Sequence, residues 1–274
     1  MSLYRKSNRT ESGNKEDDSS KDLLIACDDD SNYYFSENPT KGSEELSGLN
    51  NVMPLPIIIK SQIVSLYISA ASGSGKSTIC NHLCKNLLKM NKKIKNIFFF
   101  TVQNESDPAY KDLEKIKVKK EVENPYTKKM ETYEEPIFLN MDINNTELYD
   151  LPTEYFKDSI IILDDYDTLE KDIEKLVQLF IRKFITIGRK LNINWFILKH
   201  KTLQTHKTSD IIFEARAAII FPKLNLRESS MFLNKYMNMN SKEVSEIKKH
   251  NSRYLFIHKT IPNLLIMNDC IRMI

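Results

Sequence analysis

Glycine is scarce in this sequence. The chain has six glycines among 274 residues, whereas glycine makes up about 7% of an average protein. After residue 50 only Gly73, Gly75 and Gly188 remain. Because glycine alone enters the left-handed backbone region without steric cost, we expect a chain with so few glycines to place them where the backbone needs that freedom. Gly73 and Gly75 therefore mark a segment of interest.

Other absences exclude several classes of protein. No uncharged apolar run approaches the ~18 residues of a membrane span, and the first residues lack the apolar core of a signal peptide. The four cysteines form no pairs with zinc-ligand spacing, which is typical of a reducing compartment. Hydrophobic residues at 41% and charged residues at 28% are ordinary for a soluble globular protein. The sequence thus predicts an intracellular protein that is not secreted and has no transmembrane segment.

Charge is unevenly distributed along the chain. Residues 1–50 hold six Lys and Arg against eleven Asp and Glu, while the remaining residues hold 34 against 26. The first segment is also poor in apolar residues, and such a segment cannot bury enough surface to offset the entropy of ordering it. We therefore predict a disordered acidic N-terminal tail over 1–50 and one folded domain over 51–274.

Strand-like and helix-like segments alternate within that domain. Runs rich in branched and aromatic residues predict strands at 63–70, 94–102, 137–139, 159–163, 194–198, 217–221, 254–258 and 264–267. Apolar stripes predict helices at 77–90, about 110–116, 167–187, 227–237 and 242–250. Asp167 and Glu170 are spaced as a capping box at the start of the third helix, and Gly188 is expected to end it. Residues 103–135, with seven Lys and nine Asp and Glu, are predicted to form a charged surface insertion. The alternation favours an α/β fold with a mostly parallel central sheet flanked by helices.

A phosphate-binding loop follows the first of these strands. Residues 70–77 read Ala-Ala-Ser-Gly-Ser-Gly-Lys-Ser between a strand and a helix, which is the Walker A arrangement with Ala70 in place of its first glycine. The glycines let backbone N–H groups turn inward around phosphate oxygens, and the helix N-terminus adds its partial positive charge. Lys76 is predicted to contact the β- and γ-phosphates, and the Ser77 hydroxyl to complete a magnesium shell. The residues expected to bind the nucleotide are Ser72, Gly73, Ser74, Gly75, Lys76, Ser77 and Thr78.

A pair of aspartates supplies the second half of the expected site. The apolar strand Ile160–Leu163 ends in Asp164 and Asp165, at the carboxyl edge where ligands bind in parallel α/β sheets. We assign Asp164 to magnesium, through water, and Asp165 to polarising the attacking water. Successive side chains of a strand point to opposite faces, so the two acids are expected to have different roles. The alternative is an acidic turn that caps the next helix, a role that Asp167 fits better.

Four segments together resemble one known family. ISAASGSGKST, IFFFTVQNESDPAY, IIILDDYD and ITIGRKLNINWFIL follow the order and character of the poxvirus-type DNA-packaging ATPases of large eukaryotic DNA viruses, members of the FtsK–HerA superfamily. The resemblance covers about residues 55–270. The Asp-Asp end of the second motif and the Gly-Arg-x-Leu-Asn segment are more telling than the phosphate loop, which many families share.

The resemblance implies a fold, an activity and further site residues. It implies a RecA-like P-loop ATPase domain that uses ATP and Mg²⁺ and works as a homo-oligomeric ring around double-stranded DNA, in the virion or in a viral factory of the host cytoplasm. The motor would move viral DNA into capsids, with capsid or portal proteins as possible partners. The family's sensor residue, usually glutamine, corresponds to His200. Arg216 occupies the place of an arginine that acts across a subunit boundary, although a surface salt bridge with Glu214 or its neighbours is the alternative.

Two other functions stay open on sequence alone. A P-loop kinase acting on a small acceptor would call for an arginine-rich lid, and residues 103–135 contain no arginine. A diverged paralogue that binds nucleotide but hydrolyses little is compatible with Ala70 and His200. Near the latter, Lys199, Lys201, His206 and Lys207 form a basic cluster that is either a solvated turn or a DNA-facing loop.

Overall fold

The computed structural model describes most of the chain, in nine segments. These are residues 2–7, 23–36, 45–57, 62–102, 107–123, 128–200, 205–224, 226–259 and 263–273. The chain divides into two compact units. The first contains Met1–Ser74 and His200–Ile274, and the second contains Gly75–Lys199.

The second unit is built on four parallel strands. In spatial order they are β10 (Phe138–Asp142), β7 (Asn96–Thr101), β11 (Ser159–Asp164) and β12 (Ile193–Lys199). Every residue of β11 and β12 is buried, as expected for parallel strands covered on both faces. Asp164 pairs with Leu198 and Leu163 with Phe100, so the strands end along one carboxyl edge.

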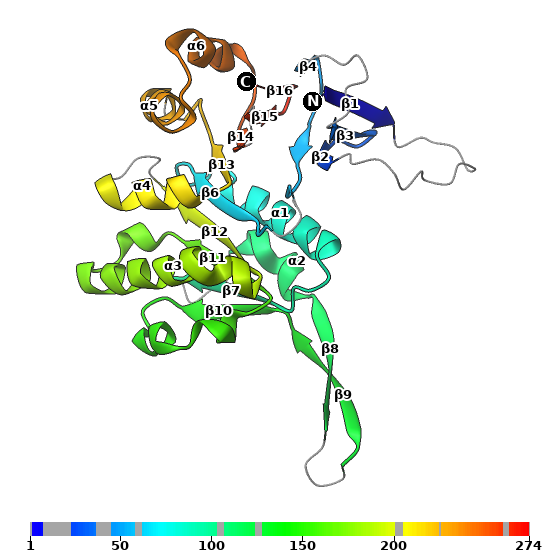
Figure 1. Ribbon diagram of the computed structural model, residues 1–274, viewed down its shortest axis with the longest axis vertical. Helices are drawn as coiled ribbons and strands as arrows, with labels where there is room; N and C mark the ends of the chain where they lie inside the picture. The colour runs from blue at the N-terminus through cyan, green and yellow to red at the C-terminus, as the bar shows by residue number, and fades with distance from the viewer. Residues whose placement is uncertain are drawn as a thin grey trace. The chain divides into compact units, whose positions relative to one another are not determined.

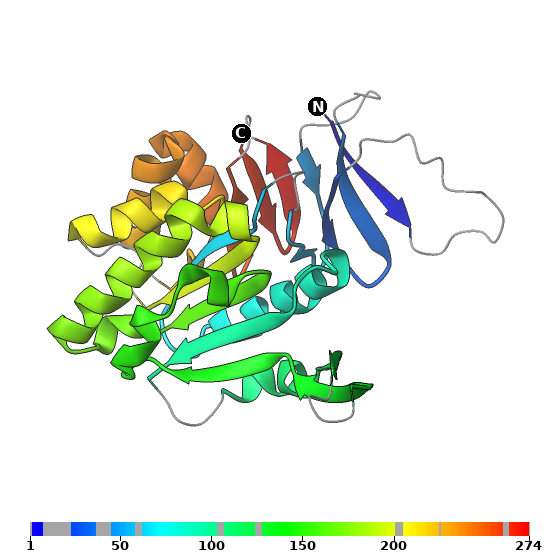
Figure 2. The same ribbon diagram turned by 60° about the horizontal axis from the view of Figure 1, so that its bottom comes forward.

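Helices cover both faces of this sheet, as Figures 1 and 2 show. The main helices are α1 (Lys76–Met90) and α3 (Lys171–Leu191), with short turns η1 (Pro108–Tyr110), α2 (Lys111–Glu114), η2 (Thr146–Asp150), η3 (Thr153–Phe156) and η4 (Tyr166–Thr168) between strands. The alternation of β7 sorts its aromatic rings between the two faces. The ring centres of Phe100 and Phe180 of α3 are 5.3 Å apart, whereas on the other face the ring centres of Phe99 and Tyr110 are 4.8 Å apart.

The end of α3 differs from the sequence prediction. Gly188 is buried inside the helix, which continues to Leu191 and ends at Asn192, whose φ of 53° is left-handed. The predicted capping box is also wrong, because Glu170 itself is the N-cap residue and no side chain caps the helix there. Asn192 takes the position usually held by glycine because asparagine tolerates the left-handed region and its amide binds Asp158 at 3.0 Å.

The charged segment 103–135 contains more regular structure than predicted. In addition to the short helix α2, it contributes the strand β8 (Lys117–Glu123) and nearly all of β9 (Met130–Pro136), which pair as an antiparallel hairpin. In Figure 1 this hairpin extends away from the second unit's sheet. Its high charge concealed the strand pattern, because a two-stranded ribbon exposes most of its residues.

Within its described residues, the first unit contains a mixed sheet and three helices. Strand β6 (Ser65–Ser69) is parallel to β13 (Ala217–Ile220), and three antiparallel strands continue from it, β14 (Leu255–His258), β15 (Leu264–Met267) and β16 (Cys270–Met273). The helices are α4 (Thr205–Glu214), α5 (Leu226–Met237) and α6 (Ser241–Lys249). The predicted strands at 254–258 and 264–267 are present and pair with each other, while α4 and β16 were not predicted.

The prediction of a disordered tail over residues 1–50 is wrong for the described parts of that segment. They form β1 (Ser2–Ser7), β2 (Leu23–Cys27), β3 (Ser31–Ser36) and β4 (Glu45–Ser47), and β2 also pairs with β5 (Met53–Pro54). Averaged composition hid two short apolar runs, in which Ile25 and Tyr33 are fully buried. Strand β4 pairs with β16, so structure continues across the predicted boundary at residue 50.

The predicted α/β fold, with a mostly parallel central sheet flanked by helices, is confirmed. Strands β7, β11 and β12 are parallel to one another, as are β6 and β13, whereas β14 and β15 form an antiparallel pair. Among the residues that the structure describes, none of the helices combines the length and apolar character that a membrane span requires.

Asn192 offers a test of the helix end. Both Asn192→Ala and Asn192→Gly remove the amide contact, but only glycine accepts the left-handed backbone without strain. We expect Asn192→Ala to be about 1 kcal/mol less stable than Asn192→Gly in urea unfolding. At the exposed helical position Lys190 the opposite order is expected. There, Lys190→Gly should be less stable than Lys190→Ala, because glycine destabilises a helix interior. Equal stability of the two Asn192 variants would contradict this helix end.

Candidate functional site

The loop between β6 and α1 has the backbone that its two glycines predict. Gly73 and Gly75 have φ values of 70° and 100°, both left-handed. A Cβ atom on Gly73 would meet nothing within 4 Å, so backbone conformation rather than space requires glycine there. Gly75 is the N-cap residue of α1, and the Ile79 N–H donates to its carbonyl at 3.0 Å. The loop therefore delivers the chain into the helix as a phosphate-binding loop does.

The predicted nucleotide-binding residues differ in exposure along this loop. Ser72, Gly73 and Thr78 are exposed, Gly75 and Ser77 are half-buried, and Ser74 and Lys76 are buried. Within the described residues the Ser74 hydroxyl has no hydrogen-bond partner. Exposed backbone beside a buried ammonium is the arrangement that an anionic ligand needs.

The structure brings the phosphate-loop lysine and the acidic strand end together. The Lys76 Nζ atom lies 3.0 Å from the Asp165 Oδ1 atom, with side chains 7% and 31% exposed. Asp165 follows the last residue of β11 in a left-handed conformation, with φ of 50° and ψ of 32°. This turn redirects the chain, so that Asp165 reaches Lys76 while Asp164 stays within the strand. The two acids thus have different surroundings, as strand alternation predicts.

Asp164 is the electrostatically unusual group of the site. Its side chain is buried, and among the described residues its Oδ1 atom has no hydrogen-bond partner. Burial raises the pKa of Asp164 to about 7; the neighbouring Asp165 adds to this shift, and the positive charge of Lys76 opposes it. A buried carboxylate oxygen without a partner is a suitable magnesium ligand, directly or through water.

Magnesium would need further oxygen ligands at this site. Ser77, in the first turn of α1, is half-buried and carries a hydroxyl. The described segments contain no cluster of three or more His, Cys, Asp or Glu side chains that could hold a metal ion. Magnesium in P-loop proteins is held by one or two protein groups together with phosphate oxygens and water, so Asp164 and Ser77 fit that kind of site.

The end of β12 lies beside the acidic turn. Lys199, its last residue, is buried, and its Nζ atom lies 4.3 Å from the ring centre of Tyr166, which follows Asp165. Lys199 thus makes a cation–π contact with Tyr166. His200 follows and is half-buried. Lys201 lies outside the described residues, as do the side chains of His206 and Lys207, so the predicted cluster stays a prediction.

Arg216 lies just before β13, at the end of the β6–β13 pair opposite to the phosphate loop. The Arg216 N–H donates to the Ser65 hydroxyl at 3.0 Å, and the guanidinium binds Gln62 rather than the alternative partner Glu214. Ser65 begins β6, whereas the phosphate loop follows Ser69 at its end. Five residues of strand span roughly 15 Å, so Arg216 lies well away from Ser69, after which the phosphate loop begins.

One residue at the loop was missed by sequence reasoning. The Arg253 Nε–H donates to the Ser74 carbonyl at 2.9 Å, across 179 positions of sequence. Arg253 lies between α6 and β14, in a segment without any recognised motif. Nothing in its local sequence distinguishes it from a solvated arginine, so only the tertiary structure reveals this contact.

Comparison with known proteins decides the family. A model of the family described as the Rad17 P-loop domain matches residues 45–210. The chain belongs to this family. The matched region includes the phosphate loop and the acidic end of β11, and the chain is therefore a P-loop NTPase. Membership of the poxvirus-type group stays a prediction.

Individual relatives are more distant. The uncharacterized protein V3 of Sputnik virophage is 26% identical over 234 residues, which cover 84% of each chain. The genome packaging NTPase B204 from Sulfolobus turreted icosahedral virus 2, in complex with ATP-gammaS, is 13% identical. This match covers 76% of this P-loop chain and 97% of B204, with a TM-score of 0.45. The cytoplasmic domain of the Thermomonospora curvata Type VII secretion ATPase EccC is 11% identical, with coverages of 84% and 29% and a TM-score of 0.49.

The raised pKa of Asp164 predicts a pH-dependent effect on stability. The folded protein keeps this proton up to about pH 7, whereas the unfolded chain loses it near pH 3.8. The wild-type protein therefore loses stability relative to Asp164→Asn as the pH rises through this range. At pH 8, without nucleotide or metal, we expect Asp164→Asn to be more stable by about 4 kcal/mol in urea unfolding.

The same advantage should disappear below about pH 4, where both side chains are neutral in the folded and unfolded states. Asp150→Asn, at an exposed position, is the matched control and should leave stability almost unchanged at every pH. A difference between wild type and Asp164→Asn that does not vary with pH would contradict the burial of a carboxylate with a raised pKa.

Proposed function

We propose that this P-loop NTPase hydrolyses ATP with magnesium and uses the energy to move viral double-stranded DNA into capsids. The observation that carries the enzymatic part is the ion pair of Lys76 with Asp165 beside the buried Asp164. The motor part rests on the four sequence segments that resemble the poxvirus-type packaging ATPases. Partners follow from that resemblance: double-stranded DNA, further copies of the chain, and capsid or portal proteins.

Each group of the site has a proposed role. The backbone N–H groups of residues 72–78 bind phosphate oxygens, and the Lys76 ammonium stabilises charge on the β- and γ-phosphates. Asp164 and Ser77 would hold magnesium, which would supply positive charge to offset the charge of the phosphates. Asp165 accepts a hydrogen bond from the attacking water once the γ-phosphate competes for Lys76. His200, at the family's sensor position, would report the γ-phosphate to the rest of the chain.

Arg216 is proposed to act on the nucleotide of a neighbouring subunit. Its position at the start of β13, away from the phosphate loop of its own chain, fits action across a subunit boundary. In a head-to-tail ring every site would then receive one arginine from the next copy. Such an arginine stabilises the charge that develops on the transferred phosphoryl group.

The first test measures ATP hydrolysis with and without double-stranded DNA. We expect DNA to raise the rate, and Lys76→Ala and Asp165→Asn each to lower kcat at least about a hundredfold, because each removes a group that stabilises the transition state or orients water. Lys92→Ala, an exposed lysine just after α1, should behave as wild type.

Other outcomes separate the alternatives. ATP hydrolysis that DNA leaves unchanged would contradict the motor. Nucleotide binding without turnover would identify a non-hydrolysing paralogue, for which Ala70 and His200 would be the residues to exchange. Transfer of phosphate to a nucleoside monophosphate would identify a kinase instead.

A second test asks whether Arg216 acts in trans. Arg216→Ala and Asp165→Asn should each be inactive alone, whereas a 1:1 mixture should recover activity at up to about a quarter of the subunit interfaces, those that join an intact acid to an intact arginine. The control mixture of Asp165→Asn with Lys76→Ala should recover nothing, because both residues belong to one site. Assembled mixed rings that stay inactive would reject the role of Arg216.

A further inference from the structure

We infer that Arg253 is a positioning residue of the phosphate loop, which fixes the direction of the peptide group between Ser74 and Gly75. The inference rests on the proposed function, in which this loop binds the phosphates of ATP. It concerns a residue outside every motif that the sequence offers. Its basis is the hydrogen bond from the Arg253 Nε–H to the Ser74 carbonyl at 2.9 Å.

Because the peptide group is planar, the hydrogen bond to the Ser74 carbonyl also sets the direction of the Gly75 N–H. In a planar trans peptide the C=O and the following N–H point in opposite directions. When Arg253 holds the Ser74 carbonyl, it also directs the Gly75 N–H away from itself. That N–H has no acceptor in the described part of the chain. There, Gly75 makes hydrogen bonds only through its carbonyl, which accepts from the Ile79 N–H. Gly75 caps α1, so its N–H is a donor available to a phosphate oxygen.

The loop needs such a constraint because of its glycine. Gly75 has a φ of 100°, and turning the preceding peptide over would bring it near −80°, which glycine adopts equally well. The residue that makes the tight turn possible therefore leaves the direction of the N–H undecided. A hydrogen bond from a charged guanidinium to the carbonyl is stronger than one from a neutral donor, and it selects one of the two directions.

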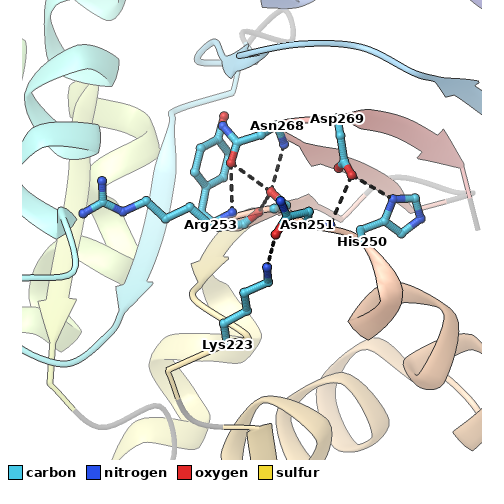
Figure 3. Close-up of polar contacts among 8 residues, drawn as sticks. Lys223, His250, Asn251, Arg253, Asn268 and Asp269 are labelled. Carbon is cyan, nitrogen blue, oxygen red and sulfur yellow. Dashed lines mark hydrogen bonds and ion pairs between the residues drawn. The ribbon is translucent and has the colours of Figure 1, made fainter.

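Arg253 is itself held in place by the turn between β15 and β16 (Figure 3). The Arg253 N–H donates to Asn268 Oδ1 at 3.0 Å, and the Asn268 N–H donates to the buried Ser252 hydroxyl at 2.8 Å. The Asn251 N–H donates to Asp269 at 3.2 Å. In Figure 3 the side chain of Arg253 extends away from this cluster of polar contacts. The backbone of the arginine is thus fixed, and its side chain is aimed at the loop.

A set of substitutions separates positioning from direct contact with phosphate. Glutamine places its Nε2 amide at the same number of bonds from Cα as the arginine Nε, so Arg253→Gln keeps the donor and removes the charge. Arg253→Met has a similar length and removes both. We expect Arg253→Met to weaken binding of magnesium ATP-gammaS about tenfold, and Arg253→Gln to stay within about threefold of wild type. Arg227→Ala, an exposed arginine on α5, is the control and should bind as wild type.

A second readout does not depend on nucleotide. With only six glycines in the chain, ¹⁵N-glycine labelling gives a simple amide spectrum, in which Gly75→Ala identifies the Gly75 signal. Without nucleotide, Arg253→Met should shift the Gly75 signal, Arg253→Gln should restore it, and the Gly188 signal should stay in place in both variants.

The outcomes distinguish this inference from the proposed function. If Arg253→Met leaves both the Gly75 signal and the affinity unchanged, the positioning role is wrong. If Arg253→Gln binds as weakly as Arg253→Met, the charge acts directly on the ligand and the inference is overturned as well. If wild-type protein binds no ATP-gammaS, the proposed function fails, while the Gly75 signal of the Arg253 variants still supports or rejects the positioning role.

Discussion

The ion pair between Lys76 and Asp165 is the contact on which the arrangement of the site depends. A buried ammonium requires a counter-charge, because an unpaired charge costs several kcal/mol when it leaves water. Asp165 supplies that charge only because the chain turns into the left-handed region directly after β11. The same turn leaves Asp164 inside the strand end, buried and with a raised pKa. The site therefore contains an acid that a cation would stabilise, next to a lysine that a phosphate would attract.

Glycine gives the backbone of the phosphate loop conformational freedom, and a residue from a distant part of the sequence restricts that freedom. Gly73 and Gly75 permit the left-handed backbone, but a glycine does not by itself decide which way a peptide faces. The hydrogen bond from Arg253 to the Ser74 carbonyl fixes that direction, and the turn between β15 and β16 holds Arg253 in place. The antiparallel strands that follow β13 thus have a function beyond extending the sheet, since their last turn supports a residue that contacts the nucleotide loop.

Several sequence predictions failed, for two different physical reasons. Gly188 is a helix-interior residue because a neighbouring asparagine, with an amide contact to Asp158, ends the helix later. Strands β1 to β4 and the hairpin of β8 and β9 lie in stretches whose average composition is highly charged. Composition averaged over a long window hides strands of three to seven residues, in which a few buried side chains decide the conformation.

The sequence by itself determined the P-loop, the acidic end of the core strand β11 and the α/β class, because these depend on residue order within short segments. Local order also placed most of the core strands and helices. Only the tertiary structure decided that Asp165 rather than Asp164 meets Lys76, that Lys199 is buried against Tyr166, and that an arginine 179 positions away holds the loop. Such contacts join segments that are distant in sequence, and no local pattern encodes the direction in which each side chain finally points.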